Sequence, residues 1–259
     1  MIILAIDIGN TRTTLGLFKG KKLTGTMHFP SASLSTKEFV WKTLNRLFRQ
    51  LRVSPSVLSG VVISSVVPTS TKMISTVTKQ KLHLHPLIVS GRLNTGIRIQ
   101  YKAPAALGAD RICSAVAANT KYGGPVIIID AGTATTYSVV SKNGTFLGGA
   151  ITPGMITAAF ALHQGTAQLP NIPLRFPRNV IGESTMENIQ SGILYGTVDA
   201  MEGLVRRIKK LTGKRTKVIL TGGFSHLLKT KARFVDKVEP TLVLEGARLI
   251  FERARTTPK

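Results

Sequence analysis

Two short segments of the chain place an aspartate, a glycine and hydroxyl or amide side chains directly after a run of apolar residues. The first is Asp7-Ile8-Gly9-Asn10-Thr11, and the second is Asp130-Ala131-Gly132-Thr133. A carboxylate among backbone N–H groups and hydroxyl donors can hold a metal-bound polyphosphate. One such segment alone is more simply a hairpin turn, because Asp and Gly are common turn residues. Two copies half a chain apart favour phosphate binding.

Each segment is predicted to form the tip of a β-hairpin. Ile127-Ile128-Ile129 is typical of a strand buried on both faces, and residues 2–6 form the equivalent run. The glycine of each segment permits a tight turn. Apolar residues resume at 15–18 and at Tyr137, Val139 and Val140, which predicts the returning strands.

Asp110 and Arg111 are predicted to lie side by side in the first turn of a helix of small residues. In one interpretation Asp110 is simply favoured at a helix N-terminus and Arg111 is exposed. In the other, Asp110 is a general base beside a guanidinium that binds a carboxylate. The spacing alone favours the first interpretation.

Two further strands are predicted to end in small or hydroxyl residues. Ser64 and Ser65 follow residues 61–63; they could contact phosphate, although a capping or turn role is simpler. Gly222 and Gly223 follow residues 218–220. They either let the backbone approach a nucleotide or form a strand-to-helix turn. Residues 148–154 are predicted to be a loop before a helix, and Ser184 to Glu187 form a capping box.

The chain is strongly basic, with 35 Lys and Arg against 12 Asp and Glu, a net charge of +23. Such a balance suits contact with nucleic acid, anionic membrane or acidic substrates. A solvated basic surface is the simpler interpretation, because no zinc spacing, aromatic interleaving or nucleic-acid module accompanies the charge. Nucleic acid is therefore a possible partner that the sequence does not favour.

The 259 residues are enough for two modest domains. No apolar run is long enough to span a membrane, and no signal peptide is apparent, so we expect no membrane contact. Cys113 is the single cysteine; it lies in an apolar helical context and is expected to be buried. A chain without disulfides fits the cytoplasm.

Seven motifs occur in a fixed order along nearly the whole chain. They are Asp7-Ile8-Gly9-Asn10-Thr11, Gly108-Ala109-Asp110-Arg111, Asp130-Ala131-Gly132-Thr133, Gly148-Gly149-Ala150-Ile151-Thr152-Pro153-Gly154, Thr166-Ala167-Gln168-Leu169-Pro170, Gly182-Glu183-Ser184-Thr185 and Thr221-Gly222-Gly223. With them the chain resembles the type III pantothenate kinases, which carry out the first step of coenzyme A synthesis. The second and fourth motifs are the most specific to that family.

The resemblance implies the duplicated α/β, ribonuclease H-like fold of the actin, hexokinase and Hsp70 ATPases, with mixed sheets and flanking helices. In that fold both aspartate hairpins face a nucleotide held between two lobes. Residues 1–115 are expected to form the N-terminal lobe, and residues 116–259 the C-terminal lobe. The implied activity is ATP-dependent phosphorylation of the primary hydroxyl of pantothenate to 4'-phosphopantothenate.

The resemblance also implies a role for each matching residue. Asp110 would accept the proton of the pantothenate hydroxyl, and Arg111, Tyr101 and Gly108 would help to hold pantothenate. Asp7 would hold Mg²⁺, directly or through water. The phosphates and nucleotide would contact Asn10, Thr11, Thr133, Gly222 and Gly223.

Asp130 would bind the monovalent cation that the family requires, K⁺ or NH₄⁺. The family is homodimeric, so Thr185 and His163 would reach the site of the partner. His163 taken alone is equally well a packing or surface residue.

One departure and two alternatives accompany the resemblance. Many relatives carry a lysine shortly after the first aspartate motif, where this chain has Arg12-Thr13-Thr14. The first alternative is a nucleic-acid-associated transcriptional regulator on the same fold, which the charge supports. The second is a related sugar or acid kinase, which the Gly-x-Asp-Arg motif disfavours.

Overall fold

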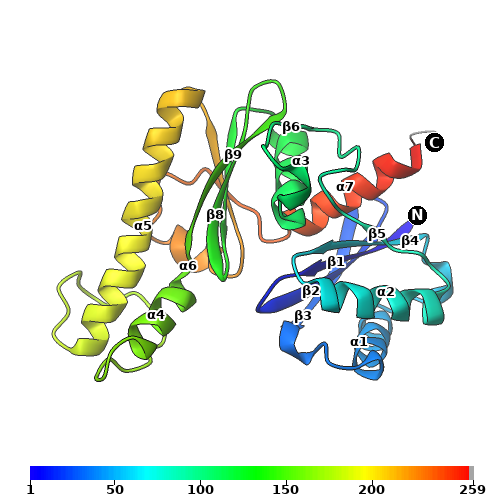
Figure 1. Ribbon diagram of the computed structural model, residues 1–259, viewed down its shortest axis with the longest axis horizontal. Helices are drawn as coiled ribbons and strands as arrows, with labels where there is room; N and C mark the ends of the chain where they lie inside the picture. Colours follow the sequence, from blue (N-terminus) through cyan, green and yellow to red (C-terminus); the bar gives the residue numbers. More distant parts are fainter. Residues whose placement is uncertain (257–259) are drawn as a thin grey trace. The chain divides into compact units, whose positions relative to one another are not determined.

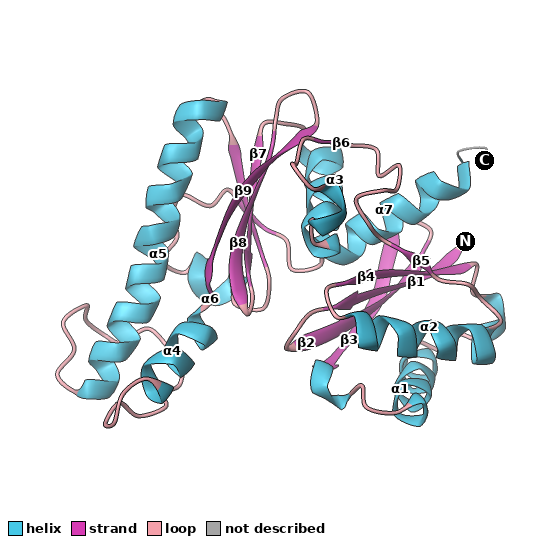
Figure 2. Cartoon of the chain, in the orientation of Figure 1, coloured by secondary structure: helices cyan, strands magenta, loops and turns pink. Residues whose placement is uncertain are grey.

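Residues 1–256 are described by a computed structural model, which divides them into two compact units (Figures 1 and 2). The first unit comprises Met1–Ala117 and the residues from Leu242 onward, and the second comprises Ala118–Thr241. Within the described residues no helix is both long enough and apolar enough to cross a bilayer.

The first unit is built on a five-stranded sheet in the order β3-β2-β1-β4-β5. Its strands are β1 (Ile2–Ile8), β2 (Arg12–Lys19), β3 (Lys22–Pro30), β4 (Gly60–Ser65) and β5 (Leu87–Ile88). The central strand β1 runs antiparallel to β2 and parallel to β4. The helices are α1 (Lys37–Gln50), α2 (Pro68–Leu82), the start of α3 (Ala109–Tyr122) and α7 (Leu242–Thr256), with short pieces η1 (Ser31–Ser33), η2 (Pro55–Val57), β6 (Arg98–Ile99) and η3 (Pro104–Ala106).

Helices cover both faces of this sheet (Figure 1). The β1 side chains that share a core with α1 and α2 are Leu4, Ile6 and Ile8. Because side chains alternate along a strand, Asp7 faces the opposite side. α7 packs on that side so tightly that a Cβ on Gly60 would lie 2.0 Å from the Phe251 ring. The sheet therefore presents Asp7 on the face covered by α7, away from α1 and α2.

The second unit repeats this plan. The strands within Ala118–Thr241 have the order β11-β10-β7-β8-β9, with β7 (Val126–Ala131), β8 (Ala134–Val140), β9 (Thr145–Pro153), β10 (Lys217–Thr221) and β11 (Lys237–Val238). The helices are α4 (Met155–Gln164), α5 (Thr185–Thr212) and α6 (Ser225–Lys229). The central strand β7 runs antiparallel to β8 and parallel to β10, as β1 does to β2 and β4. The predicted duplicated α/β fold is confirmed.

The end of the chain differs from the predicted division into residues 1–115 and 116–259. The first unit extends to Ala117, and α7 returns to it. α7 contacts β1, β4 and β2, and a Cβ on Gly246 would lie 1.8 Å from the carbonyl oxygen of Cys113. The last helix thus crosses α3 at backbone contact, which only a glycine allows. Its apolar face is buried in the first unit rather than the second.

Candidate active site

Asp7 lies near the carboxyl end of the central strand β1. In the sheet it is opposite Thr14 on β2 and Ser64 on β4. Ser64 is fully buried, and its hydroxyl donates to Oδ1 of Asp7 over 3.1 Å. This bond holds the carboxylate in one orientation. A capping or turn role was the simpler expectation for Ser64, whereas the structure places its hydroxyl on the Asp7 carboxylate. Its signal in the sequence is its place at the end of a buried strand.

The tip of the first hairpin is closed by backbone bonds. The N–H of Gly9 donates to the carbonyl of Arg12 over 3.0 Å, and the N–H of Ser31 donates to the carbonyl of Thr11 over 2.9 Å. Asn10 and Thr11 are exposed. The predicted hairpin is confirmed, and its tip presents polar side chains to solvent.

Asp110 and Arg111 begin α3, as predicted, but the guanidinium is not on the surface. Arg111 is only 7% exposed, so the interpretation that required an exposed arginine is wrong. The N–H of Arg111 donates to Oδ1 of Asp110 over 2.8 Å. Burial raises the pKa of the Asp110 carboxyl above its ordinary value, and the hydrogen bond and charge of Arg111 oppose this only in part. A partly desolvated carboxylate with such a pKa suits proton transfer.

Cys113, one turn further along α3, connects Asp110 with Asp7. Its thiol is completely buried, as predicted. Burial, followed by the charges of Asp7 and then of Asp110, raises the pKa of the thiol, while a hydrogen bond with Ser64 lowers it. The charges of both carboxylates thus act on the same buried thiol, which indicates that Asp7 and Asp110 lie in one region of the first unit.

The segment before α3 places the other two predicted substrate residues. A Cβ on Gly108 would lie 2.4 Å from Oδ1 of Asp110, so the glycine leaves room for that carboxylate. Tyr101 is 39% exposed and lies nine residues before Asp110 along the chain. Gly108 is thus tied to Asp110 by direct contact, and Tyr101 offers an exposed phenol in the same segment.

Asp130 in the second unit occupies the position that Asp7 holds in the first. It is opposite Thr136 on β8 and Thr221 on β10. Gly222 directly follows Thr221 with φ +91, and a Cβ there would lie 2.4 Å from Oδ1 of Asp130 and 2.6 Å from the carbonyl oxygen of Ala131. Gly222 is required for this close approach. The exposed Gly223 leads on into α6, so a strand-to-helix turn is present.

The tip of the second hairpin, at Thr133, is held by the chain that follows β9. The N–H of Gly154 and the hydroxyl of Thr157 both donate to the carbonyl of Thr133, over 3.0 and 2.6 Å. Thr133 itself is exposed. Residues 148–153, predicted to be a loop, instead belong to strand β9, because they pair with β8 from Ala134 onward.

His163 and Thr185 lie on α4 and α5 of the second unit, and both are exposed. Nδ1 of His163 lies 2.8 Å from the carbonyl oxygen of Leu169, so this nitrogen is the donor. Thr185 is the first residue of α5, directly after Ser184, whose side chain accepts from the N–H of Glu187 as the capping box predicted. Neither residue lies on the two hairpins of the site.

The donor set fits cations that bind together with phosphate. Among residues 1–256 no group of three or more His, Cys, Asp or Glu side chains could hold a metal by itself. Mg²⁺ in phosphate-transfer sites usually takes one or two carboxylates, with phosphate and water completing its shell. Each hairpin taken by itself offers one carboxylate of this kind, Asp7 in the first unit and Asp130 in the second. Asp7 is the candidate for Mg²⁺.

The duplicated sheets, each with a carboxylate at the end of its central strand, define an ATPase fold of the actin and hexokinase type. A solved structure of the same fold is component A of the (R)-2-hydroxyglutaryl-CoA dehydratase of Acidaminococcus fermentans. The TM-score is 0.61 at 13% identity, covering 99% of this chain and 100% of that chain.

Sequence comparison gives the family. The sequence model of the type III pantothenate kinases matches residues 3–207. A type III pantothenate kinase of Dehalococcoides mccartyi is 38% identical over 96% of this chain and 97% of its own length. One of Moorella thermoacetica is 37% identical over 97% of this chain and 99% of its own length. The chain belongs to the type III pantothenate kinase family, whose members phosphorylate pantothenate in coenzyme A synthesis. Family membership therefore favours pantothenate kinase activity over both alternatives, a sugar or acid kinase and a nucleic-acid-associated transcriptional regulator.

Because the pKa of Asp110 is raised, the stability of the folded protein should depend on pH through this carboxyl. Asp110→Asn keeps an acceptor for the N–H of Arg111 and removes the charge that burial disfavours. Because the folded protein holds the Asp110 proton more tightly than the unfolded chain, wild-type stability falls as the pH rises through the window above 3.8. The variant should therefore melt at a higher temperature than the wild type near neutral pH.

Scanning calorimetry across pH checks this. The advantage of Asp110→Asn should shrink as the pH is lowered towards 3.8. Asp199→Asn, which removes an exposed carboxylate on α5, serves as the control and should show no such trend. An advantage of Asp110→Asn that is equal at every pH would contradict a raised pKa.

Proposed function

We propose that Asp110 is the catalytic residue that receives the proton of the primary hydroxyl of pantothenate during phosphoryl transfer from ATP. The hydroxyl oxygen forms a bond to the γ-phosphorus, the bond to ADP breaks, and the proton passes to the Asp110 carboxylate. The observation that carries this role is the half-buried Asp110 with its raised pKa beside the buried Arg111. Positioning dominates such reactions, so Asp110 orients the hydroxyl as well as accepting its proton.

Arg111, Tyr101 and Gly108 hold pantothenate in this proposal. A guanidinium binds a carboxylate through two parallel hydrogen bonds, and pantothenate carries one carboxylate. Burial of Arg111 strengthens such a charge pair because little water competes with it. Gly108 leaves space beside the Asp110 carboxylate for the substrate hydroxyl.

Each unit contributes a hairpin to the nucleotide. In the first, Asp7 holds Mg²⁺, and Asn10 and Thr11 donate to phosphate. In the second, Thr133 contacts phosphate, and Gly222 and Gly223 line the nucleotide. Mg²⁺, when bound, neutralises charge on the transferring phosphoryl group. Two observations support this assignment of the hairpins to the nucleotide. The hairpins occupy equivalent positions in their sheets, and the threonines at both tips, Thr11 and Thr133, are exposed.

Asp130 binds a monovalent cation, K⁺ or NH₄⁺. The Asp130 carboxylate and the carbonyl oxygen of Ala131 both lie beside Gly222, where a Cβ would fill the space. A carboxylate and a carbonyl oxygen are ligands that suit a hard cation.

The active form is a homodimer in this proposal. Large apolar side chains are exposed on β9, α4, the loop before α5 and the start of α5: Ile151, Ile156, Phe160, Val180, Ile181 and Met186. Exposed apolar groups in such number usually mark an interface. His163 and Thr185 lie on the same elements, so they can reach the substrate site of a partner.

The catalytic role is tested with Asp110→Asn. The amide keeps size and shape but accepts a proton poorly, so turnover should fall by roughly 10²- to 10⁴-fold. The Michaelis constant for ATP should change little. Steady-state ADP release with saturating pantothenate measures both. Asp199→Asn is the matched control, and near wild-type turnover in Asp110→Asn would remove Asp110 from the mechanism.

The cation site is tested with Asp130→Asn. Losing the carboxylate weakens the attraction for K⁺, so half-maximal activation should need about tenfold more K⁺ or more. A K⁺ titration of ADP release at constant ionic strength measures the shift. Gly222→Ala, which fills the same space, should act in the same direction. An unchanged titration in both variants would rule out this site.

The dimer is tested with Phe160→Asp. A charge placed in a buried apolar interface is costly, so the variant should be monomeric at concentrations where the wild type is a dimer. Sedimentation velocity gives the mass of each. Lys42→Asp, at an exposed position of α1, is the control. A wild type that remains monomeric at high micromolar concentration would contradict the homodimer.

A further inference from the structure

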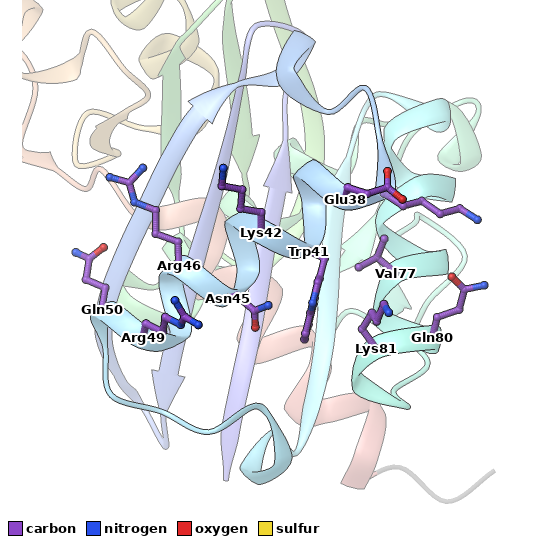
Figure 3. A pocket seen from close by; sticks show the side chains of 11 residues that line it. Glu38, Trp41, Lys42, Asn45, Arg46, Arg49, Gln50, Val77, Gln80 and Lys81 are labelled. Carbon is purple, nitrogen blue, oxygen red and sulfur yellow. The ribbon is translucent and has the colours of Figure 1, made fainter.

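A groove between α1 and α2 carries part of the unexplained positive charge. Its volume is about 1080 Å³. Its lining residues are Lys37, Glu38, Trp41, Lys42, Asn45, Arg46, Arg49 and Gln50 from α1, and Val77, Gln80 and Lys81 from α2 (Figure 3). Five of these are cations and one is an acid. We call this surface the α1–α2 groove.

The groove is separate from the phosphoryl-transfer site. α1 and α2 cover the face of the first sheet that carries Leu4, Ile6 and Ile8. Asp7 projects from the other face, the one that α7 covers. A ligand in the groove therefore leaves Asp7 and Asp110 untouched.

The cations of the groove are not neutralised by the protein. In the part of the chain that the structure describes, none of the five forms an ion pair, although ion pairs occur at Lys121–Glu239 and Arg248–Glu252. Lys42, Arg46 and Arg49 follow one another at spacings of four and three, which places them along one side of α1. Unpaired like charges along a concave surface concentrate a field that attracts a polyanion.

The remaining lining residues favour one kind of polyanion. Trp41 is half-buried, and Figure 3 shows its indole turned towards the helix that carries Val77 and Lys81. An indole face stacks on a nucleobase, and the side-chain amides of Asn45 and Gln80 offer both donors and acceptors to base edges. A membrane surface would need protruding apolar groups, whereas Val77 is only 2% exposed.

We propose that the α1–α2 groove binds single-stranded nucleic acid. The phosphates lie along Lys42, Arg46 and Arg49, and a base stacks on Trp41. α1 has 14 residues and is therefore about 21 Å long, which suits a strand of a few nucleotides. This binding goes beyond pantothenate phosphorylation and does not depend on it.

Trp41 is the single tryptophan of the chain, so its fluorescence reports on the groove alone. A mixed-sequence oligonucleotide of about 20 nucleotides should quench it at low salt. The slope of log K against log salt should be about −2 to −3, as expected for three or four phosphate contacts on a single strand. Fluorescence anisotropy of a labelled oligonucleotide gives an independent binding curve.

Two charge-reversal variants separate the groove from net charge. The groove variant is Lys42→Glu with Arg46→Glu and Arg49→Glu. The control is Arg206→Glu with Arg207→Glu and Lys210→Glu on α5; all six residues are exposed, and both variants have the same net charge. The groove variant should bind about tenfold or more weakly, with pantothenate-dependent ADP release unchanged. The control should bind much as the wild type does.

Three results would overturn the proposal. The first is an oligonucleotide that neither quenches Trp41 nor raises anisotropy at low salt. The second is an equal loss in both variants, which would mean binding by net charge alone. The third is that inorganic polyphosphate or an acidic peptide quenches Trp41 and displaces the oligonucleotide at lower concentration, which would assign the groove to another polyanion.

Discussion

The site depends on the pairing of each central strand with a parallel neighbour. In the first sheet the pairing sets Asp7 opposite Ser64, and in the second it sets Asp130 opposite Thr221. The flanking strands are buried, so the register cannot slip by one residue without turning the carboxylate and the core side chains to the wrong faces. The core thus fixes where the charge stands, and Ser64 fixes how the Asp7 carboxylate is turned.

This constraint explains which parts of the fold were predictable. Runs such as 127–129 are apolar at every position, so the central strands and their hairpins followed from sequence. The strand that follows each hairpin in the chain, β3 in the first sheet and β9 in the second, was not predicted. β3 has no buried residue and alternates between exposed and partly buried positions, and β9 contains Gly148, Gly149 and Pro153, which are typical of loops. Spacing could not predict that Arg111 is buried, because neighbouring positions in a helix say nothing about what covers each of them.

The family match and the charge answer different questions. Pantothenate phosphorylation follows from the family, whereas the roles of Asp110, Asp7 and Asp130 remain proposals that the geometry supports. None of that chemistry requires a net charge of +23. The α1–α2 groove gives part of this charge a location, on the sheet face opposite Asp7. One chain can therefore carry a kinase site and a basic surface that do not compete.

The most direct test of pantothenate kinase activity is ADP release by the wild-type protein with ATP and Mg²⁺, with and without pantothenate. We expect ADP release to require pantothenate and to saturate with it. We also expect one phosphorylated product per ADP, which mass spectrometry and NMR should show to be modified at the primary hydroxyl. ADP release that is indifferent to pantothenate, or that a sugar supports instead, would contradict this activity.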